Sequence, residues 1–211
     1  GYINVDNRKM SKSAGDCFWV RDAAKKFGFG AIRYFLLASH YRNPVNFSEV
    51  ILAQSAAALE RLQNCRENLA FRLENAGNAT DAPSLAAEAE QIMARKADFL
   101  AAMDDDFNTA NAIAVLFEIT RDINTLLKNE SVSADILRTL LGFYDELLGL
   151  FGFLPEEKTA DGDAEIEALV AERTKAKKEK DYQKADELRA RLKEMGVTLE
   201  DTPQGTKWKK A

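Results

Sequence analysis

The clearest candidates for chemistry lie near the start of the chain, where positions 9–15 read KMSKSAG. Two lysines three positions apart alternate with small hydroxyl residues. Such a loop can surround a triphosphate, and its lysines can neutralise the charge that develops on departing pyrophosphate. The residue types alone therefore favour a loop that can hold phosphates. A basic loop that binds nothing is the alternative.

A second group of candidates lies near the C-terminus, where lysines surround Trp208. Residues 173–211 carry twelve Lys/Arg and seven Asp/Glu. Lysines attract nucleic-acid phosphates in a salt-dependent way, and an exposed indole can stack on an unpaired base. We therefore expect a nucleic-acid contact that includes Lys178, Arg189 and Lys207. Trp208 could instead anchor the terminal strand on neighbouring helices.

The charge is unevenly distributed along the chain. Residues 1–44 carry a net charge of +5 and residues 45–172 a net charge of −15, and the rest of the chain is again +5. An acidic middle between two basic ends favours a protein that contacts a polyanion at two separated places. Ordinary solvated faces are the alternative.

Composition limits the classes of protein that remain. The chain has 211 residues, of which 46% are hydrophobic and 30% charged, which excludes a membrane protein and a disordered one. The first ten residues lack the apolar core of a signal sequence. Cys17, Cys65 and the single histidine, His40, cannot build a disulfide framework or a four-ligand zinc site. We expect a cytoplasmic chain that binds no metal and has neither a membrane nor DNA as partner.

Apolar periodicity predicts the elements that must hold these residues. Helices are expected over 48–73 and 85–103, after a cap at Asp106 or Asn108, and after a cap at Ser133. Their short connections favour an antiparallel bundle. Ahead of it, residues 1–5 read as a strand end and 31–39 as a helix. Behind it we expect a polar linker, helices over 164–178 and after Asp181, a stop at Gly196 and a two-stranded hairpin.

Four stretches together resemble the cysteinyl-tRNA synthetase family. KMSKS is the signature pentapeptide of class I aminoacyl-tRNA synthetases. The other stretches are IRYFLLASHYRNPVNFS at 32–48, DDFNTANAIAVLF at 105–117 and ARLKEMGVTLEDTPQGTKW at 190–208. The resemblance covers nearly all of the chain, but only the C-terminal portion of the enzyme. The HIGH motif and the zinc-bearing Rossmann core are not in this sequence.

The resemblance implies a mainly α fold with a defined domain order. Residues 1–46 would be the C-terminal edge of the catalytic core, with the KMSKS loop and the stem-contact fold. Residues 47–154 would form a DALR-like helical bundle, 155–164 a linker and 165–211 a small α/β anticodon-recognition domain. ATP would be a substrate of the full-length enzyme, with its phosphates held by Lys9, Met10, Ser11, Lys12 and Ser13 and with Lys9 and Lys12 as catalytic residues. Zinc would be bound only in the missing N-terminal catalytic part. The bundle is expected to act as a spacer.

The resemblance also implies tRNA(Cys) as partner. Arg33, His40, Tyr41 and Arg42 would belong to the stem-contact element, although Arg33 and His40 could instead serve the fold. Many relatives carry an acidic residue where this chain has Gly30, so an ion pair that would tether this helix is not expected. The expected tRNA-binding residues are Arg42, Lys178, Arg189, Asp201, Gln204, Thr206, Lys207 and Trp208.

Two alternative functions remain open at this point. One is a freestanding RNA-binding helical module without catalysis. The other is the related ligase that couples cysteine to a glucosamine-inositol in mycothiol synthesis, although that enzyme has no use for a tail such as GTKWKK. If the chain is part of a cysteinyl-tRNA synthetase, we expect it to be inactive in isolation, because the HIGH motif and the zinc site are missing.

Overall fold

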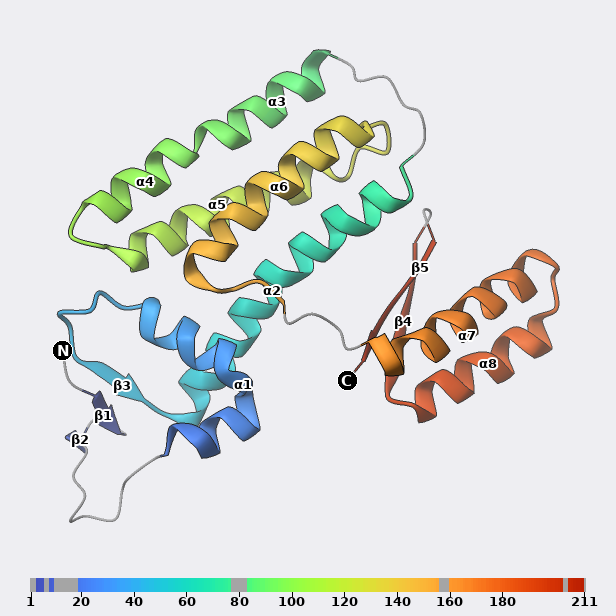
Figure 1. The fold of residues 1–211 in the computed structure, drawn as a ribbon, viewed down its shortest axis with the longest axis horizontal. Coiled ribbons are helices and arrows are strands. Elements are labelled where there is room, and N and C mark those ends of the chain that lie inside the picture. Colours follow the sequence, from blue (N-terminus) through green and yellow to red (C-terminus); the bar gives the residue numbers. More distant parts are fainter. Residues whose placement is uncertain are drawn as a thin grey trace. The chain divides into compact units, whose positions relative to one another are not determined.

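The computed structural model describes residues 3–5, 8–9, 19–76, 83–155, 160–202 and 205–210. These residues are mainly helical, as the sequence predicts. Packing divides the chain into two compact units, Gly1–Pro155 and Glu156–Ala211. Figure 1 shows the elements of each unit, and the two units are described separately below.

The first unit begins with a small sheet and a kinked helix. Strand β1 (Ile3–Val5) lies between β2 (Arg8–Lys9), which is antiparallel to it, and β3 (Val45–Phe47), which is parallel to it. Helix α1 (Val20–Leu37) has a kink at Gly28, whose φ of 78° is left-handed. The predicted helix over 31–39 matches only the part after the kink. In the part before it only Ala23 is buried, so apolar periodicity gives little signal there.

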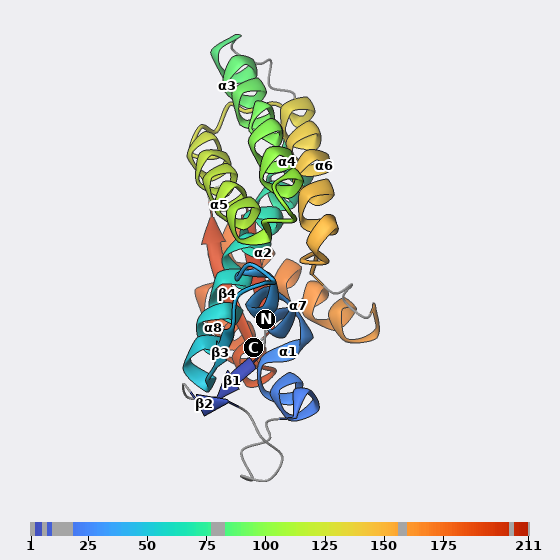
Figure 2. The same cartoon turned by 90° about the vertical axis from the view of Figure 1, so that its left-hand side faces the viewer.

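Five further helices form the bundle of the first unit. They are α2 (Glu49–Glu74), α3 (Pro83–Ala94), α4 (Lys96–Asp104), α5 (Thr109–Leu126) and α6 (Ala134–Phe151). The single helix predicted over 85–103 is in fact α3 and α4, which follow one another with a break at Arg95. Figure 2 shows α5 and α6 on opposite sides of this pair.

Side-chain caps start the bundle helices where the sequence predicts them. The hydroxyl of Ser48 accepts a hydrogen bond from the Ile51 amide at 3.2 Å, and that of Ser133 accepts from Ile136 at 3.3 Å. Of the two residues considered ahead of α5, Asn108 is the cap. Each cap satisfies one of the free amides of a first turn, which stabilises the helix by roughly 1 kcal/mol.

The bundle encloses one large apolar core. Fully buried side chains come from α2, α4, α5 and α6, and Tyr144 of α6 is among them. Its hydroxyl lies 2.7 Å from Thr120 Oγ1 and donates to the carbonyl of Leu62 at 3.3 Å. Cys65 lies beside this network, where burial raises the pKa of its thiol to about 12. The thiol is therefore a packed structural group rather than a nucleophile.

Helix α1 packs closely on α2 because position 30 has no side chain. A Cβ at Gly30 would lie 2.8 Å from Leu59 Cδ2, too close for two carbon atoms. Gly30 therefore leaves room for the Leu59 side chain at the contact between α1 and α2. The exposed pair of Lys26 and Glu49, at 2.6 Å, also links α1 to α2.

The second unit is two helices and a hairpin. Helices α7 (Ala160–Lys178) and α8 (Tyr182–Glu194) precede β4 (Val197–Thr202) and β5 (Gly205–Lys210), which pair antiparallel. Asp181 caps α8 and Gly196, with φ of 75°, follows its end. Ile166, Leu169, Val170, Leu192 and Val197 form a separate small core. Helix α7 begins at Ala160, a few residues before the predicted start.

None of the helices in the described part of the chain has both the length and the apolar character that a membrane span requires.

Candidate nucleic-acid interface

Strand β2 contains the first residue of the predicted phosphate loop. Lys9 pairs through its backbone with Asn4 of β1. Met10, Ser11, Lys12 and Ser13 lie outside the described residues. The ATP-phosphate roles of these five residues therefore stay predictions.

Arg33 serves the fold of the first unit. Its guanidinium donates to the carbonyl of Gly152, 119 positions away, at 2.9 Å. Gly152 follows α6 in the left-handed conformation and is that helix's C-cap. Of the two roles considered for Arg33, the structure supports packing between elements.

The turn after α1 is held by one carboxylate. Tyr41 donates from its hydroxyl to Asp106 Oδ1 at 2.8 Å, and Arg42 Nη2 lies 2.9 Å from Asp106 Oδ2. His40 stacks on Tyr41 with ring centroids 4.8 Å apart, and its Nδ1 accepts from the Arg42 amide. His40 is thus a structural residue in this turn. The Arg42 side chain remains 68% exposed, so it is accessible to a ligand.

Asp106, which the sequence suggested only as a possible helix cap, is a positioning residue for Tyr41 and Arg42. It lies in the turn between α4 and α5, where both Asp106 and Phe107 have left-handed φ values of 53° and 52°. Such backbone is uncommon outside glycine and is most tolerated by Asn and Asp. Thr109 fastens the same turn to α1, donating to the Leu37 carbonyl at 2.7 Å. The turn therefore holds the Arg42 segment from the bundle side.

In the second unit, Asp201 is the centre of an ion cluster. Arg173 donates to both of its carboxylate oxygens at 2.9 Å, and Lys177 and Thr206 also donate to it. The hydrogen bond from Arg173, followed by that from Lys177, lowers the pKa of Asp201 far below its ordinary value. Arg173 is 3% exposed, so it does not face a phosphate. Asp201, predicted to read RNA, is fully engaged in joining the hairpin to α7.

Among the other basic residues of the second unit, some form ion pairs and others line a hollow. Lys184 pairs with Glu172 at 2.7 Å and Arg191 with Glu165 at 2.9 Å. Arg189 and Lys193 instead line a hollow of about 420 Å³ between α8 and β4. Asp186 lines the same hollow, so the cations there share it with a carboxylate. The predicted attraction by the whole basic tail is reduced to a few side chains.

Trp208 lies opposite Leu199 in the hairpin and packs against the small core of the second unit while remaining partly exposed. This position is compatible both with stacking on an unpaired base and with anchoring the terminal strand. Thr206 is likewise partly exposed. Gln204 lies outside the described residues, and the side chains of Lys178 and Lys207 are not described.

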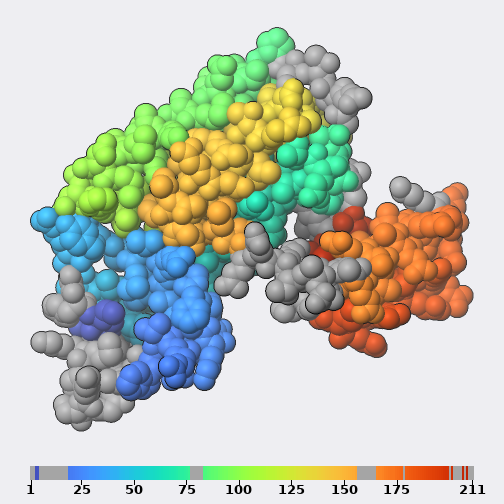
Figure 3. All heavy atoms as spheres, in the orientation of Figure 1, coloured from blue at the N-terminus to red at the C-terminus, as the bar shows by residue number. Residues whose placement is uncertain are grey.

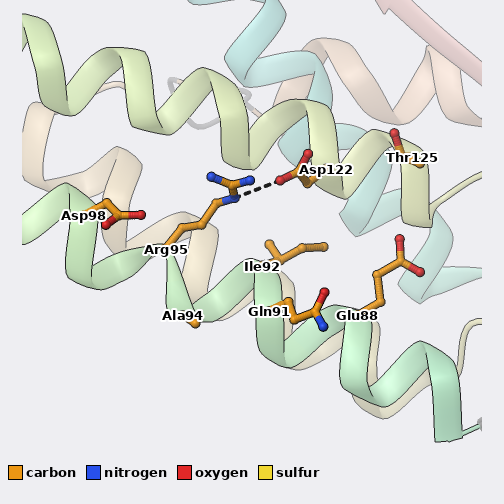
Figure 4. A pocket seen from close by; sticks show the side chains of 8 residues that line it. All are labelled: Glu88, Gln91, Ile92, Ala94, Arg95, Asp98, Asp122 and Thr125. Carbon is orange, nitrogen blue, oxygen red and sulfur yellow. Dashed lines mark ion pairs between the residues drawn. The ribbon is translucent and has the colours of Figure 1, made fainter.

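A hollow of about 420 Å³ between α3, α4 and α5 has the opposite chemistry (Figure 4). Glu88, Asp98 and Asp122 line it, and its single cation, Arg95, pairs with Asp122 and with Glu118, each at 2.8 Å. These carboxylates disfavour a polyanion. In the described part of the chain, no group of three or more acidic, cysteine or histidine side chains is placed to hold a metal ion.

Comparison with protein-family profiles divides the chain into three matched parts. Residues 1–57 match the tRNA synthetases class I (C) catalytic domain, 98–155 the DALR domain and 159–208 the cysteinyl-tRNA ligase anticodon binding domain. A LeuRS chain, solved in a ternary complex with tRNA and LeuAMS from Agrobacterium radiobacter K84, superposes with a TM-score of 0.59 at 24% identity. The superposition covers 72% of this chain and 20% of that one, and it shows the fold alone.

The three matched parts are those of a class I aminoacyl-tRNA synthetase, in the order catalytic segment, DALR domain and anticodon binding domain. Over its whole length the chain matches the C-terminal part of cysteine–tRNA ligases. It is 43% identical to that of Clostridioides difficile, 41% to that of Bacillus pumilus and 41% to that of Brevibacillus brevis. The chain spans 44–45% of the length of these relatives.

Proposed function

We propose that the chain is the tRNA-recognition half of a cytoplasmic cysteine–tRNA ligase, which uses ATP to attach cysteine to tRNA(Cys). The observation that carries this proposal is the match of residues 159–208 to a cysteinyl-tRNA ligase anticodon binding domain, within a chain that aligns in full with such ligases. A cysteine ligase of mycothiol synthesis would have no use for this domain. The match of residues 1–57 to a catalytic domain disfavours a freestanding RNA-binding module.

The proposed roles follow the three parts of the chain. Lys9, Met10, Ser11, Lys12 and Ser13 would steady the phosphates of ATP while cysteinyl-adenylate forms. Arg42, held in an exposed position by Asp106, would contact the acceptor side of the tRNA. Arg189 and Trp208 would contact the anticodon loop, together with Lys178, Gln204, Thr206 and Lys207. Asp201 would act indirectly, by orienting Thr206, to which it is hydrogen-bonded at 2.8 Å.

In this proposal, the N-terminal part of the ligase, outside this chain, recognises cysteine. The relatives are more than twice as long, and their N-terminal part would supply the HIGH motif and the zinc ion that binds the substrate thiol. The described residues gather no ligand set for that ion. Adenylate formation would therefore need both parts, whereas RNA binding would need only this one.

Replacing Trp208 tests the proposed function. The parent chain should bind a tRNA(Cys) transcript more tightly than a transcript with an altered anticodon, as measured by filter binding. Trp208→Ala should lose about tenfold in affinity for tRNA(Cys), because base–aromatic stacking contributes roughly 1–3 kcal/mol per base. Most of the discrimination between the two transcripts should disappear with it.

Two matched variants control this experiment. Trp19→Ala removes an equally large but 68% exposed indole from the other unit and should bind as the parent does. Trp208→Phe keeps an aromatic face and an apolar contact to Leu199, and should retain most of the affinity. Equal affinity of Trp208→Ala and the parent would remove Trp208 from the interface. Equal binding of both transcripts by the parent would contradict the proposed function itself.

A further inference from the structure

The hydroxyl proton of Thr206 has a fixed direction. Thr206 Oγ1 lies 2.8 Å from Asp201 Oδ1. Asp201 is ionised, because two cations, Arg173 and Lys177, donate to the same carboxylate. An ionised carboxylate only accepts hydrogen bonds, and a threonine hydroxyl has one proton. Thr206 is therefore the donor in this bond, and its proton points at Asp201.

The carboxylate of Asp201 has no capacity left for a further donor. Its Oδ1 accepts from Arg173 Nη1 and from Thr206, and its Oδ2 accepts from Arg173 Nη2 and from Lys177. Two bonds to each oxygen use the roughly four lone-pair sites of a carboxylate. Asp201 thus orients Thr206 and offers no free acceptor of its own.

The remaining hydrogen-bonding capacity of Thr206 is that of an acceptor. Its neighbour on α7, Thr174, lies 3.5 Å away between the two hydroxyl oxygens and donates to the Val170 carbonyl at 2.8 Å. Because Thr174 has a single proton, the shorter bond to Val170 uses it. Thr206 is partly exposed, so the lone pairs of its oxygen face a ligand that supplies a donor.

Thr206 and Trp208 share one face of the hairpin. They are two positions apart in β5, and side chains alternate between the two faces along a strand. Two residues advance a strand by about 6.6 Å, which is comparable to the width of a nucleobase. A base that contacts the partly exposed indole can therefore present one edge to the Thr206 oxygen.

We propose that Thr206 determines specificity in the anticodon contact by accepting a hydrogen bond from the exocyclic amino group of one base. This inference rests on the proposed function and adds to it the chemical group that is recognised. Guanine, cytosine and adenine carry an amino donor, whereas uracil has a carbonyl oxygen where cytosine has its amino group. The anticodon that pairs with the cysteine codons is GCA, so each of its bases offers such a donor.

The test removes one amino group of the RNA at a time. Three modified tRNA(Cys) molecules carry inosine for guanine, uracil for cytosine, or purine riboside for adenine in the anticodon. Binding of the 211-residue chain to each is measured by filter binding and compared with unmodified tRNA(Cys). Thr206→Val keeps the shape of the side chain without its hydroxyl, and Thr206→Ser keeps the hydroxyl. The thermal midpoint of each variant is recorded alongside.

The hydroxyl and the amino group should be coupled in a double-mutant cycle. The parent should lose about three- to tenfold in affinity with the modified RNA that lacks the recognised amino group. Thr206→Val should bind unmodified tRNA(Cys) more weakly by a similar factor and should lose nothing further with that modified RNA, because both changes remove the same hydrogen bond. Thr206→Ser should respond to all three RNAs as the parent does.

Two controls separate a base contact from a displaced hairpin. Thr139→Val removes an exposed hydroxyl from α6, where it donates to the Asp135 carbonyl, and should bind every RNA as the parent does. Thr206→Val should keep the parent's slope of log K against log[salt], because no phosphate contact is lost. A shallower slope would mean that cations of the second unit have moved, and would overturn the assignment of a base contact to Thr206.

The outcomes also separate this inference from the proposed function. A parent chain that discriminates against an altered anticodon but binds all three modified RNAs as tightly as unmodified tRNA(Cys) would overturn this inference alone, whatever the stability of the variants. Undiminished sensitivity of Thr206→Val to all three modified RNAs would do the same. A parent chain that binds no tRNA, or that ignores an altered anticodon, would contradict the proposed function and this inference with it.

Discussion

At the scale of single residues, Asp201 has the most strongly lowered pKa among the described carboxyl groups of the second unit. Its carboxylate accepts from Arg173, Lys177 and Thr206, and these bonds favour its ionised form. Both Nη atoms of the buried Arg173 guanidinium pair with this carboxylate, whereas its Nε has no partner among the described residues. The pair joins α7 to the hairpin that carries Trp208. Asp201, which the sequence predicts to contact RNA, therefore fixes the position of the hairpin that carries Thr206 and Trp208.

Asp201 should make the stability of the second unit depend on pH. Because its folded pKa lies below the ordinary value of 3.8, the stabilisation is complete above about pH 4. It is lost as the pH falls from there toward the folded pKa, because the unfolded chain takes up the proton first. We expect urea unfolding at pH 3, followed by Trp208 fluorescence in a Trp19→Phe background, to show lower stability than at pH 6.

Asp201→Asn is the decisive variant for this effect. It should be less stable than the parent at pH 6 and should lose less stability than the parent between pH 6 and pH 3. Glu194→Gln removes an exposed carboxylate from α8 of the same unit and should keep the pH dependence of the parent. A parent-like pH profile for Asp201→Asn would assign the effect to other carboxylates.

At the scale of elements, the end of α6 is where three helices meet. Arg33 of α1 donates to the Gly152 carbonyl, and Gln63 of α2 donates to that of Phe153 at 3.1 Å. The Phe153 ring is fully buried and lies 5.5 Å from the ring of Tyr34. The left-handed Gly152, with φ of 63°, allows α6 to end in this crowded place.

Two glycine substitutions in and after α6 should act in opposite directions. Gly152→Ala should lower the free energy of unfolding by about 1–3 kcal/mol, because the backbone is left-handed and a Cβ would overlap the Arg33 guanidinium. Gly142→Ala, at an exposed helical site with open space around it, should raise that free energy by about 0.5–1 kcal/mol. Chemical denaturation followed by far-UV circular dichroism measures both. A neutral Gly152→Ala would show that the α6 terminus is not constrained as described.

At the scale of the whole molecule, the described residues form one apolar core in the bundle and another in the second unit, and these two share no residue. A smaller cluster of Ala23, Phe35 and Leu52 lies beside the bundle core in the first unit. The bundle core includes Leu140 and Tyr144, and the core of the second unit includes Leu192 and Val197. Figure 3 shows the surfaces that cover them, with α6 exposed between α2 and the α3–α4 pair. Each unit can therefore lose its packing without exposing the core of the other.

We expect the two units to unfold in separate transitions. Leu140→Ala should cost about 2–5 kcal/mol in the bundle and leave the midpoint seen by Trp208 fluorescence unchanged. Leu192→Ala should do the reverse, lowering the Trp208 midpoint while calorimetry still shows the larger transition in place. A single transition that moves with either variant would mean that the units are thermodynamically coupled.

Local features of the chain were predictable from sequence because they depend on neighbours along the chain. Ser48, Ser133 and Asp181 cap the helices that follow them, and Gly196 ends α8. Two features of the helices were missed because the local sequence gave little indication of them. The start of α1 buries a single alanine, and the break at Arg95 interrupts a helix whose periodicity continues across it.

The amino-acid sequence by itself determined the mainly helical class, the element order and the family resemblance, because propensities, caps and motifs are read over a few adjacent residues. Only the tertiary structure decided which charged side chains are available to a ligand. Arg33 meets Gly152 from 119 positions away, and Arg173 meets Asp201 from 28. Pairing of charges depends on distances that the fold creates, and spacing along the chain does not contain them.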